Sequence, residues 1–173
     1  MLATVGDGAY KLLFVLHILG VVIGFGTVFL NGLYGAQAKS RRGGEGLAIV
    51  EATYSVGQAA EWFIYSIPIT GIILILLSDD AYKFSQTWVS VSFLLYIVAL
   101  GVVHGVHLPN IRRMRALMAE LTAGPPAGAA GGGPPPQVAE LQQRGQRAAL
   151  LGGILDLIVV VVIVLMVWKP GYP

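Results

Sequence analysis

Near its C-terminal end the chain reads AALLGGILDLIVVVVIVLMVW over residues 148–168, and Asp156 is the one charged side chain in this run. A helix needs roughly 20 mostly apolar residues to cross about 30 Å of hydrocarbon. The run meets that requirement by itself. It ends on Trp168 and is followed by Lys169, side chains that favour the membrane surface. The stretch therefore predicts a transmembrane helix.

Three other stretches have the same apolar character, at about residues 10–34, 61–78 and 87–107. Apolar residues make up 55% of the chain and charged residues 12%, a balance typical of membrane spans. The first stretch is interpreted as a retained helix, because it is longer than the roughly 7–15 residues of a signal-peptide core. We expect residues 1–173 to form one all-α domain, a four-transmembrane-helix bundle in the inner (cytoplasmic) membrane of a cell.

Composition also argues against several functions. The formal net charge of +2 is too small, and too confined to the loops, for a nucleic-acid-binding face. The chain has no cysteine, which excludes disulfides, thiolate catalysis and iron–sulfur clusters. No Ser/His/Asp pattern or phosphate-binding loop is found, so a hydrolytic enzyme is the least favoured class. The lipid bilayer is the first expected partner.

Basic residues set the expected orientation. The first and third connections between the spans hold eight lysines and arginines, against three in the other segments. Since positive charge favours the cytoplasmic side, we expect both connections in the cytoplasm and both termini outside. The eight are Lys39, Arg41, Arg42, Arg112, Arg113, Arg115, Arg144 and Arg147.

The third connection divides into two parts. Residues 110–121 alternate apolar and basic positions at helical spacing, which predicts a surface-lying or partner-binding continuation of the third helix. A protein partner or anionic lipid is the expected ligand of this segment. Residues 123–137 are rich in glycine and proline and predict a flexible linker.

Four ionisable residues are expected in one layer of the membrane, toward its cytoplasmic side: Glu61, His104, His107 and Asp156. His104 and His107 are three residues apart and would share a face of a regular helix. Two imidazoles and two carboxylates suit a divalent metal ion or a proton relay. Alternatively, Asp156 pairs with His104 to hold two helices together, while His107 and Glu61 face interfacial water.

A second polar position lies nearer the outer surface, at His17 in the first span. Gly20 and Gly24 continue its helix face at steps of three and four, so this face must point into the bundle. One interpretation makes His17 an axial ligand of haem b, with the glycines admitting the flat cofactor. The other is a histidine hydrogen-bonded to a serine of a neighbouring helix. His17 and His104 differ too much in depth to bind one haem.

Three motifs carry a resemblance: KLLFVLHILG at residues 11–20, PITG at 68–71 and LMVWKP at 165–170. Together they resemble a bacterial family of predicted four-helix integral membrane proteins with a domain of unknown function. The first helix is also similar to the four-helix bacterial protoporphyrinogen oxidases and to the copper-resistance D membrane proteins. In the oxidases a first-helix histidine and a third-helix lysine are implicated with haem. His17 matches the first of these, whereas Ser90, Ser92 and Phe93 stand where the lysine would fall.

Three functions follow from these patterns. The first is an accessory or structural component of a membrane assembly. The second is a b-type haem-binding or electron-transfer protein that uses His17. The third is a small metal or proton-linked transporter, which would need a homo-oligomer because one four-helix chain leaves little room for alternating access.

Overall fold

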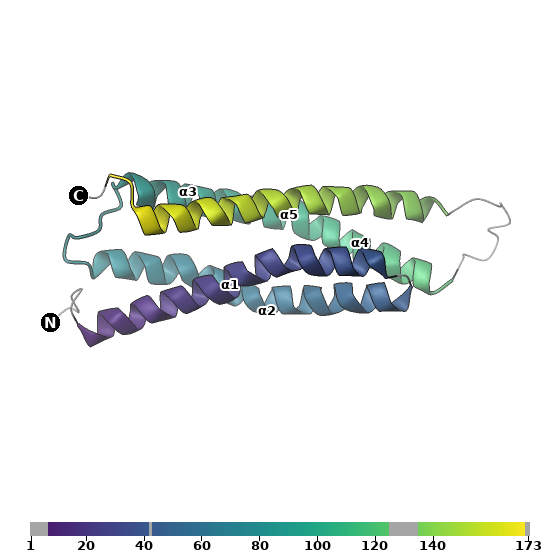
Figure 1. The fold of residues 1–173 in the computed structure, drawn as a ribbon, viewed down its shortest axis with the longest axis horizontal. Coiled ribbons are helices and arrows are strands. Elements are labelled where there is room, and N and C mark those ends of the chain that lie inside the picture. The colour runs from purple at the N-terminus through teal and green to yellow at the C-terminus, as the bar shows by residue number, and fades with distance from the viewer. Residues whose placement is uncertain (1–6, 42, 125–134, 172–173) are drawn as a thin grey trace.

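The computed structural model describes residues 7–41, 43–124 and 135–171, and every regular element in these ranges is helical. The helices run side by side along the long axis of an elongated bundle (Figure 1). This confirms the predicted all-α class. The elements are α1 (Gly8–Ser40), α2 (Gly44–Leu76), α3 (Thr87–Val102), the π-helix η1 (Val103–His107), α4 (Leu108–Thr122) and α5 (Pro136–Trp168).

Since α3, η1 and α4 follow one another without a break, the chain has four helices long and apolar enough to cross a membrane. This confirms the predicted number of spans. Both termini and the α2–α3 turn lie at one end of the bundle, called here the termini end, and the α1–α2 connection lies at the other, the loop end (Figure 1). Most of the predicted 123–137 linker, residues 125–134, lies outside the described residues. Which end faces the cytoplasm stays a prediction from charge.

The helices are longer than a bilayer is thick. At 1.5 Å per residue, the 33 residues of α1, α2 and α5 each extend about 50 Å, against about 30 Å of hydrocarbon. The predicted apolar spans lie toward the termini end, so residues 44–60, α4 and the first part of α5 extend the bundle beyond them at the loop end. The third helix does continue as predicted, but α4 packs against α5 and α2, and Leu117 on it is fully buried. It is part of the bundle and does not lie alone on a surface.

Glycines bring α1 and α2 into close contact. A methyl group added to Gly24 would lie 2.9 Å from Ile64 Cγ1 and 3.3 Å from the Ile64 backbone nitrogen. One added to Gly20 would lie 3.0 Å from Ser66 Oγ. Small residues are what let two membrane helices approach in this way. The α1–α2 pair is therefore held by backbone proximity as well as by side-chain packing.

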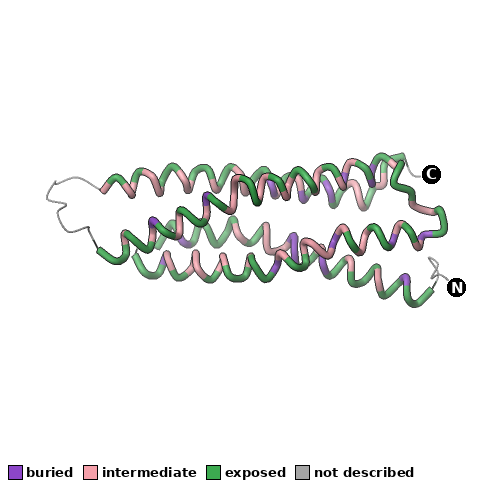
Figure 2. The backbone as a smooth tube through the Cα atoms, turned by 180° about the vertical axis from the view of Figure 1, so that it is seen from behind, coloured by how far each residue is buried: buried purple, intermediate pink, exposed green. Residues whose placement is uncertain are grey.

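A small apolar core joins this pair to α5. It consists of Phe25, Ile67, Val159 and Val162, with Val21, Leu95, Ile158 and Met166 packed against it. Buried segments are short and separated along the helices, and exposed positions run along the outer sides (Figure 2). Such a surface suits a protein that buries its outside in lipid.

One side of the bundle is less tightly closed. α5 packs against α1, α3 and α4, and α2 packs against α1 and, at the loop end, α4, whereas α2 and α3 make few direct contacts. Long side chains bridge the two instead: the Tyr96 hydroxyl donates to the Ile64 carbonyl at 3.2 Å. One polar contact described below, between Tyr65 of α2 and His104 of η1, lies on this side.

Gly24→Ala should destabilise the bundle by about 1–3 kcal/mol, because the added methyl group overpacks the contact with Ile64. Gly32→Ala is the matched control on the same helix, since a methyl group there meets nothing within 4 Å. Alanine favours helix, so the control should be neutral or slightly stabilising. Thermal unfolding in one detergent, followed by the helical circular dichroism signal, measures both. Equal melting temperatures would contradict the proposed contact.

Candidate functional site

His17 forms a hydrogen bond between α1 and α2. It is half-buried, and its Nδ1 lies 2.8 Å from the Thr70 hydroxyl. That hydroxyl already donates its one proton to backbone carbonyls of its own helix, with the Ser66 and Ile67 oxygens at 2.8 and 3.1 Å. It therefore accepts from His17 Nδ1–H, and the ring carries its unprotonated lone pair on Nε2. The sequence alternative gave His17 a serine partner on a neighbouring helix; the partner is instead the hydroxyl of Thr70 on the second helix.

The glycines near His17 pack against protein. The His17 ring lies over Gly71, where an added methyl group would be 3.4 Å from Cε1. The space beside Gly20 and Gly24, predicted to admit a flat cofactor, is filled by Ser66 and Ile64 of α2. The structure thus assigns these two glycines a packing role, and their contact with a cofactor stays a prediction.

A second polar group crosses from α2 to η1. The Tyr65 hydroxyl lies 2.8 Å from His104 Nε2, and the two ring centroids are 6.1 Å apart. Glu61 lies one helical turn before Tyr65 on α2. The sequence predicted Glu61 and His104 at one depth, but it missed Tyr65, the residue that bonds His104. The signal was available, because a residue four positions after Glu61 lies on the same helix face.

The two histidines of η1 have different surroundings. The Leu108 amide donates to the Val103 carbonyl, the i→i+5 bond of a π-helix. The wider turn rotates residues three apart away from a common face. His104 is exposed, whereas His107 is half-buried and its Nδ1 has no hydrogen-bond partner among the described residues. Single-turn π-helices inside α-helices are frequent at functional sites.

Asp156 stands apart from these groups. It is half-buried on α5, and its buried Oδ1 has no hydrogen-bond partner in the described part of the chain. The predicted alternative of an Asp156–His104 pair does not form between the described side chains: Asp156 Oδ1 has no partner, and the His104 bond that does form joins Nε2 to Tyr65. Within residues 7–41, 43–124 and 135–171, no three His, Cys, Asp or Glu side chains come together to hold a metal ion. The predicted four-residue layer is thus not assembled as a metal site within one chain.

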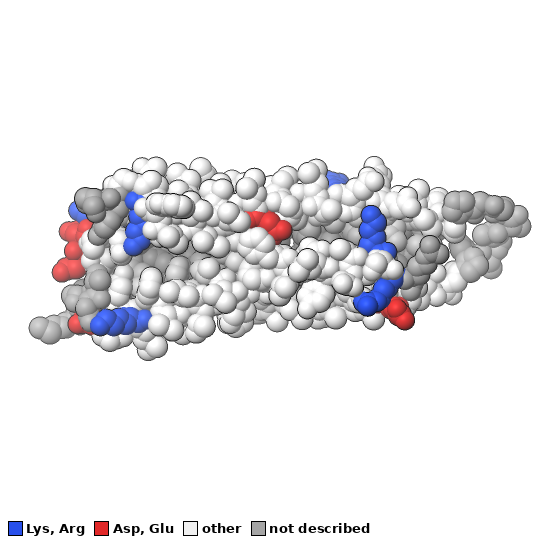
Figure 3. All heavy atoms as spheres, in the orientation of Figure 1, with Lys and Arg blue, Asp and Glu red and all other residues white. Residues whose placement is uncertain are grey.

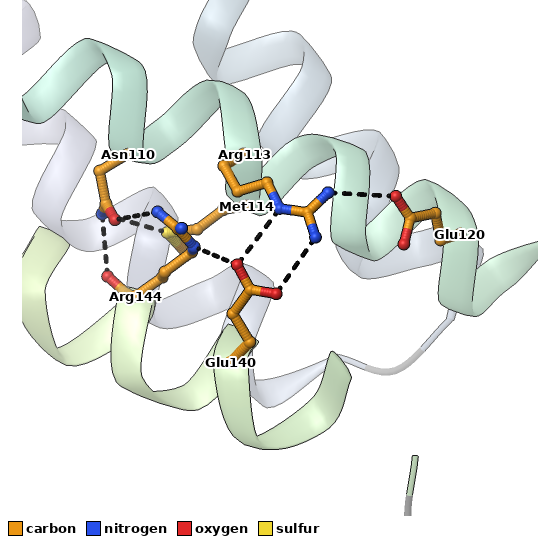
Figure 4. Close-up of polar contacts among 6 residues, drawn as sticks. All are labelled: Asn110, Arg113, Met114, Glu120, Glu140 and Arg144. Atoms are coloured by element: carbon orange, nitrogen blue, oxygen red, sulfur yellow. Dashed lines mark hydrogen bonds and ion pairs between the residues drawn. The ribbon is translucent and has the colours of Figure 1, made fainter. Parts of the chain in front are cut away.

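Charged side chains join α4 to α5 at the loop end (Figure 4). Arg113 binds both oxygens of Glu140, at 3.2 and 3.1 Å, and Glu120 at 3.3 Å. Arg144 donates to Glu140 Oε1 at 2.8 Å. Asn110 donates to the Arg144 carbonyl at 3.0 Å and accepts from its guanidinium at 3.3 Å. This network extends the bundle where the apolar stretches have ended.

A parallel set of contacts joins α2 to α4. Arg115 binds both carboxylate oxygens of Glu51, one of them at 2.9 Å from Nε, and its guanidinium carbon lies 3.8 Å from the centre of the Tyr54 ring. Arg112 Nε donates to the Tyr54 hydroxyl at 3.3 Å. Tyr54 is therefore held on its ring face by one arginine and bonded at its hydroxyl to another.

Charged side chains gather at the two ends of the molecule, and the middle of the face in Figure 3 is uncharged except for one acidic patch. A family model described as "Predicted integral membrane protein (DUF2269)" matches residues 11–170. The chain belongs to this family. The predicted family resemblance is thereby confirmed, and with it a multi-pass membrane protein. No curated protein and no solved structure matches the chain, so the similarity to the oxidases and the copper proteins stays a prediction.

Glu140→Gln should lower the melting temperature by weakening the contacts to Arg113 and Arg144. Glu140 lies before the apolar run of α5, and hydrogen bonds from Arg113 and then Arg144 lower its pKa below the ordinary value. Its contribution to stability is therefore present above the ordinary glutamate pKa and lost as the pH falls through the lowered one. The melting temperature of the variant should therefore fall less than that of the wild type as the pH is lowered through that range.

Glu45→Gln is the control for this prediction, because Glu45 faces Arg41 at 4.0 Å and both side chains are exposed. Such a surface pair contributes little to stability. Thermal unfolding at a series of pH values compares the two variants. An equal effect of both substitutions would show that the α4–α5 network adds nothing to stability.

Proposed function

We propose that the protein is an accessory component of a membrane assembly and docks through Gly101, His104 and Gly105, called here the α3 glycine face. The observation that carries this proposal is the exposed imidazole of His104 inside the apolar third helix, between two exposed glycines. An accessory role is the first of the three functions expected from the sequence, and the α3 glycine face is the surface through which the protein would bind its partner.

The imidazole argues for a covering partner. Tyr65 bonds Nε2 of His104, and no group in the described residues bonds Nδ1. A polar group that faces hydrocarbon without a partner costs free energy, so such residues in spans nearly always face protein or water. A partner side chain that hydrogen-bonds Nδ1 would remove this cost.

The glycines argue that the partner is a helix. A methyl group on Gly101 or on Gly105 would meet nothing within 4 Å. The two are four residues apart, the Gly-x-x-x-Gly spacing that lets a second membrane helix approach the backbone closely. We therefore infer a transmembrane helix of another protein, with a serine, threonine, asparagine or glutamine at the depth of His104.

Photo-cross-linking in intact membranes tests this surface. A photoreactive phenylalanine derivative at position 101 or 105 should give one discrete adduct whose cross-linked peptide comes from a transmembrane segment of another protein. The adduct should fall several-fold in a His104→Leu background, because the polar contact is lost. Position 153 is the control, since Gly153 is also exposed with open space around it but lies on α5.

Two outcomes would contradict the proposal. The first is an equal yield from positions 101, 105 and 153, which would reflect random collision. The second is an adduct only with another copy of this chain, which would replace the accessory role with a homo-oligomer.

His17 supports a second candidate function, binding of b-type haem. Metal-bound histidines commonly donate the proton of the other ring nitrogen to an oxygen acceptor, which fixes the ring and its tautomer. His17 has this arrangement with Thr70 and keeps the Nε2 lone pair for a ligand. A bound haem would supply one-electron transfer. No comparable observation favours the transporter, because its four predicted ligands do not converge among the described residues.

Absorption spectra test the haem candidate directly. Protein purified in mild detergent after expression with added haem should show a Soret band that sharpens on reduction with dithionite. His17→Ala should abolish the band, and Thr70→Val should shift or weaken it because the ring loses its acceptor. His104→Ala should leave it unchanged. A colourless wild-type preparation would rule out haem binding by His17.

A further inference from the structure

Three cations at the loop end lack a carboxylate partner among the described residues. Every carboxylate at this end forms an ion pair with an arginine. Glu45 pairs with Arg41 and Glu51 pairs with Arg115. Glu120 and Glu140 both pair with Arg113, and Glu140 also pairs with Arg144. The unpaired cations are Lys39, Arg112 and Arg147, called here the basic collar, and all three are exposed. Figure 3 shows basic side chains crossing one face of the loop end with few acidic ones beside them.

The distances of these residues from the apolar runs put the collar at the expected level of the lipid headgroups. Arg147 directly precedes the apolar run 148–168, while Lys39 and Arg112 each follow their apolar runs, 10–34 and 87–107, by five residues. Five residues of helix extend about 7.5 Å. The polar region of a bilayer adds about 5–8 Å on each side of the hydrocarbon. Long basic side chains at this height can reach lipid phosphates.

Arg112 has a more specific geometry than the other two. Its Nε donates to the Tyr54 hydroxyl, and the Tyr54 ring is held from its face by Arg115, which is itself fixed by Glu51. The two terminal amino groups of Arg112 have no hydrogen-bond acceptor within the described part of the chain. A guanidinium held by Nε presents this pair of donors in the fork that fits two phosphate oxygens.

We propose that Arg112, positioned by Tyr54, binds the phosphate of an anionic phospholipid at the loop-end surface of the bilayer. The collar favours a lipid of net negative charge, since its three positive charges are not balanced within the described chain. Arg113 and Arg115 are neighbours of Arg112 on α4, but their guanidinium groups are occupied by carboxylates. The lipid site is thus one arginine of residues 110–121 rather than the whole segment.

Thermal unfolding of the full chain in mild detergent, with added phosphatidylglycerol, phosphatidylcholine or inorganic phosphate, tests the site. Phosphatidylglycerol should raise the melting temperature in a saturable way, because a ligand that binds only the folded state stabilises it. The other two additives should not. Arg112→Gln should lose most of the rise. Tyr54→Phe should weaken the apparent affinity several-fold, because the arginine loses its acceptor.

Arg113→Gln is the matched control. The substitution removes the same charge from the next residue on α4. The variant protein should melt at a lower temperature, because Arg113 binds Glu120 and Glu140, and it should still be stabilised by phosphatidylglycerol. Arg112→Lys keeps the charge without the paired donors and should respond several-fold more weakly. The proposal is overturned by an equal loss in Arg113→Gln, by a full response in Arg112→Lys, or by an equal rise with inorganic phosphate, which would make this a free-phosphate site.

Discussion

The close approach of α1 to α2 at Gly20 and Gly24 is the contact on which the rest of the bundle depends. Apolar side chains alone do not favour helix association in lipid, because the lipid tails are equally apolar. Backbone proximity supplies the van der Waals contact instead, and it brings His17 within hydrogen-bond distance of Thr70. With α2 drawn toward α1, its contacts with α3 and η1 are made by long side chains, Tyr96 to α3 and Tyr65 to η1.

The loop end is held together by a different interaction. Beyond the apolar runs, charged groups no longer carry the cost of facing hydrocarbon, and arginine–carboxylate pairs join α4 to α5 and α2 to α4. The bundle thus changes from glycine-mediated packing near the middle of α1 to paired charges at the loop end. Arg112 has no carboxylate partner among the described residues, and its guanidinium is therefore available to a ligand outside the chain.

The candidate site was only partly predictable. The common depth of Glu61 and His104 followed from helical rise, and the structure bonds His104 to Tyr65, one helical turn after Glu61. His104 and His107 were expected on one face, but the π-helix turns them apart. The alternative of an Asp156–His104 pair does not form: His104 Nε2 is bonded to Tyr65 of α2, although α5 packs against η1. Tyr65 was missed because aromatic residues are common in spans, although its position four residues after Glu61 places it on the same helix face.

The sequence by itself determined the helical class, the four spans and the basic character of the loop end, because hydropathy and charge are properties of single residues summed over a local window. Only the tertiary structure decided which helices touch, which arginines are paired and which ring nitrogen of His17 stays free. These depend on how each helix is rotated and how far it lies from its neighbours, and those two quantities result from the packing of residues far apart in the chain.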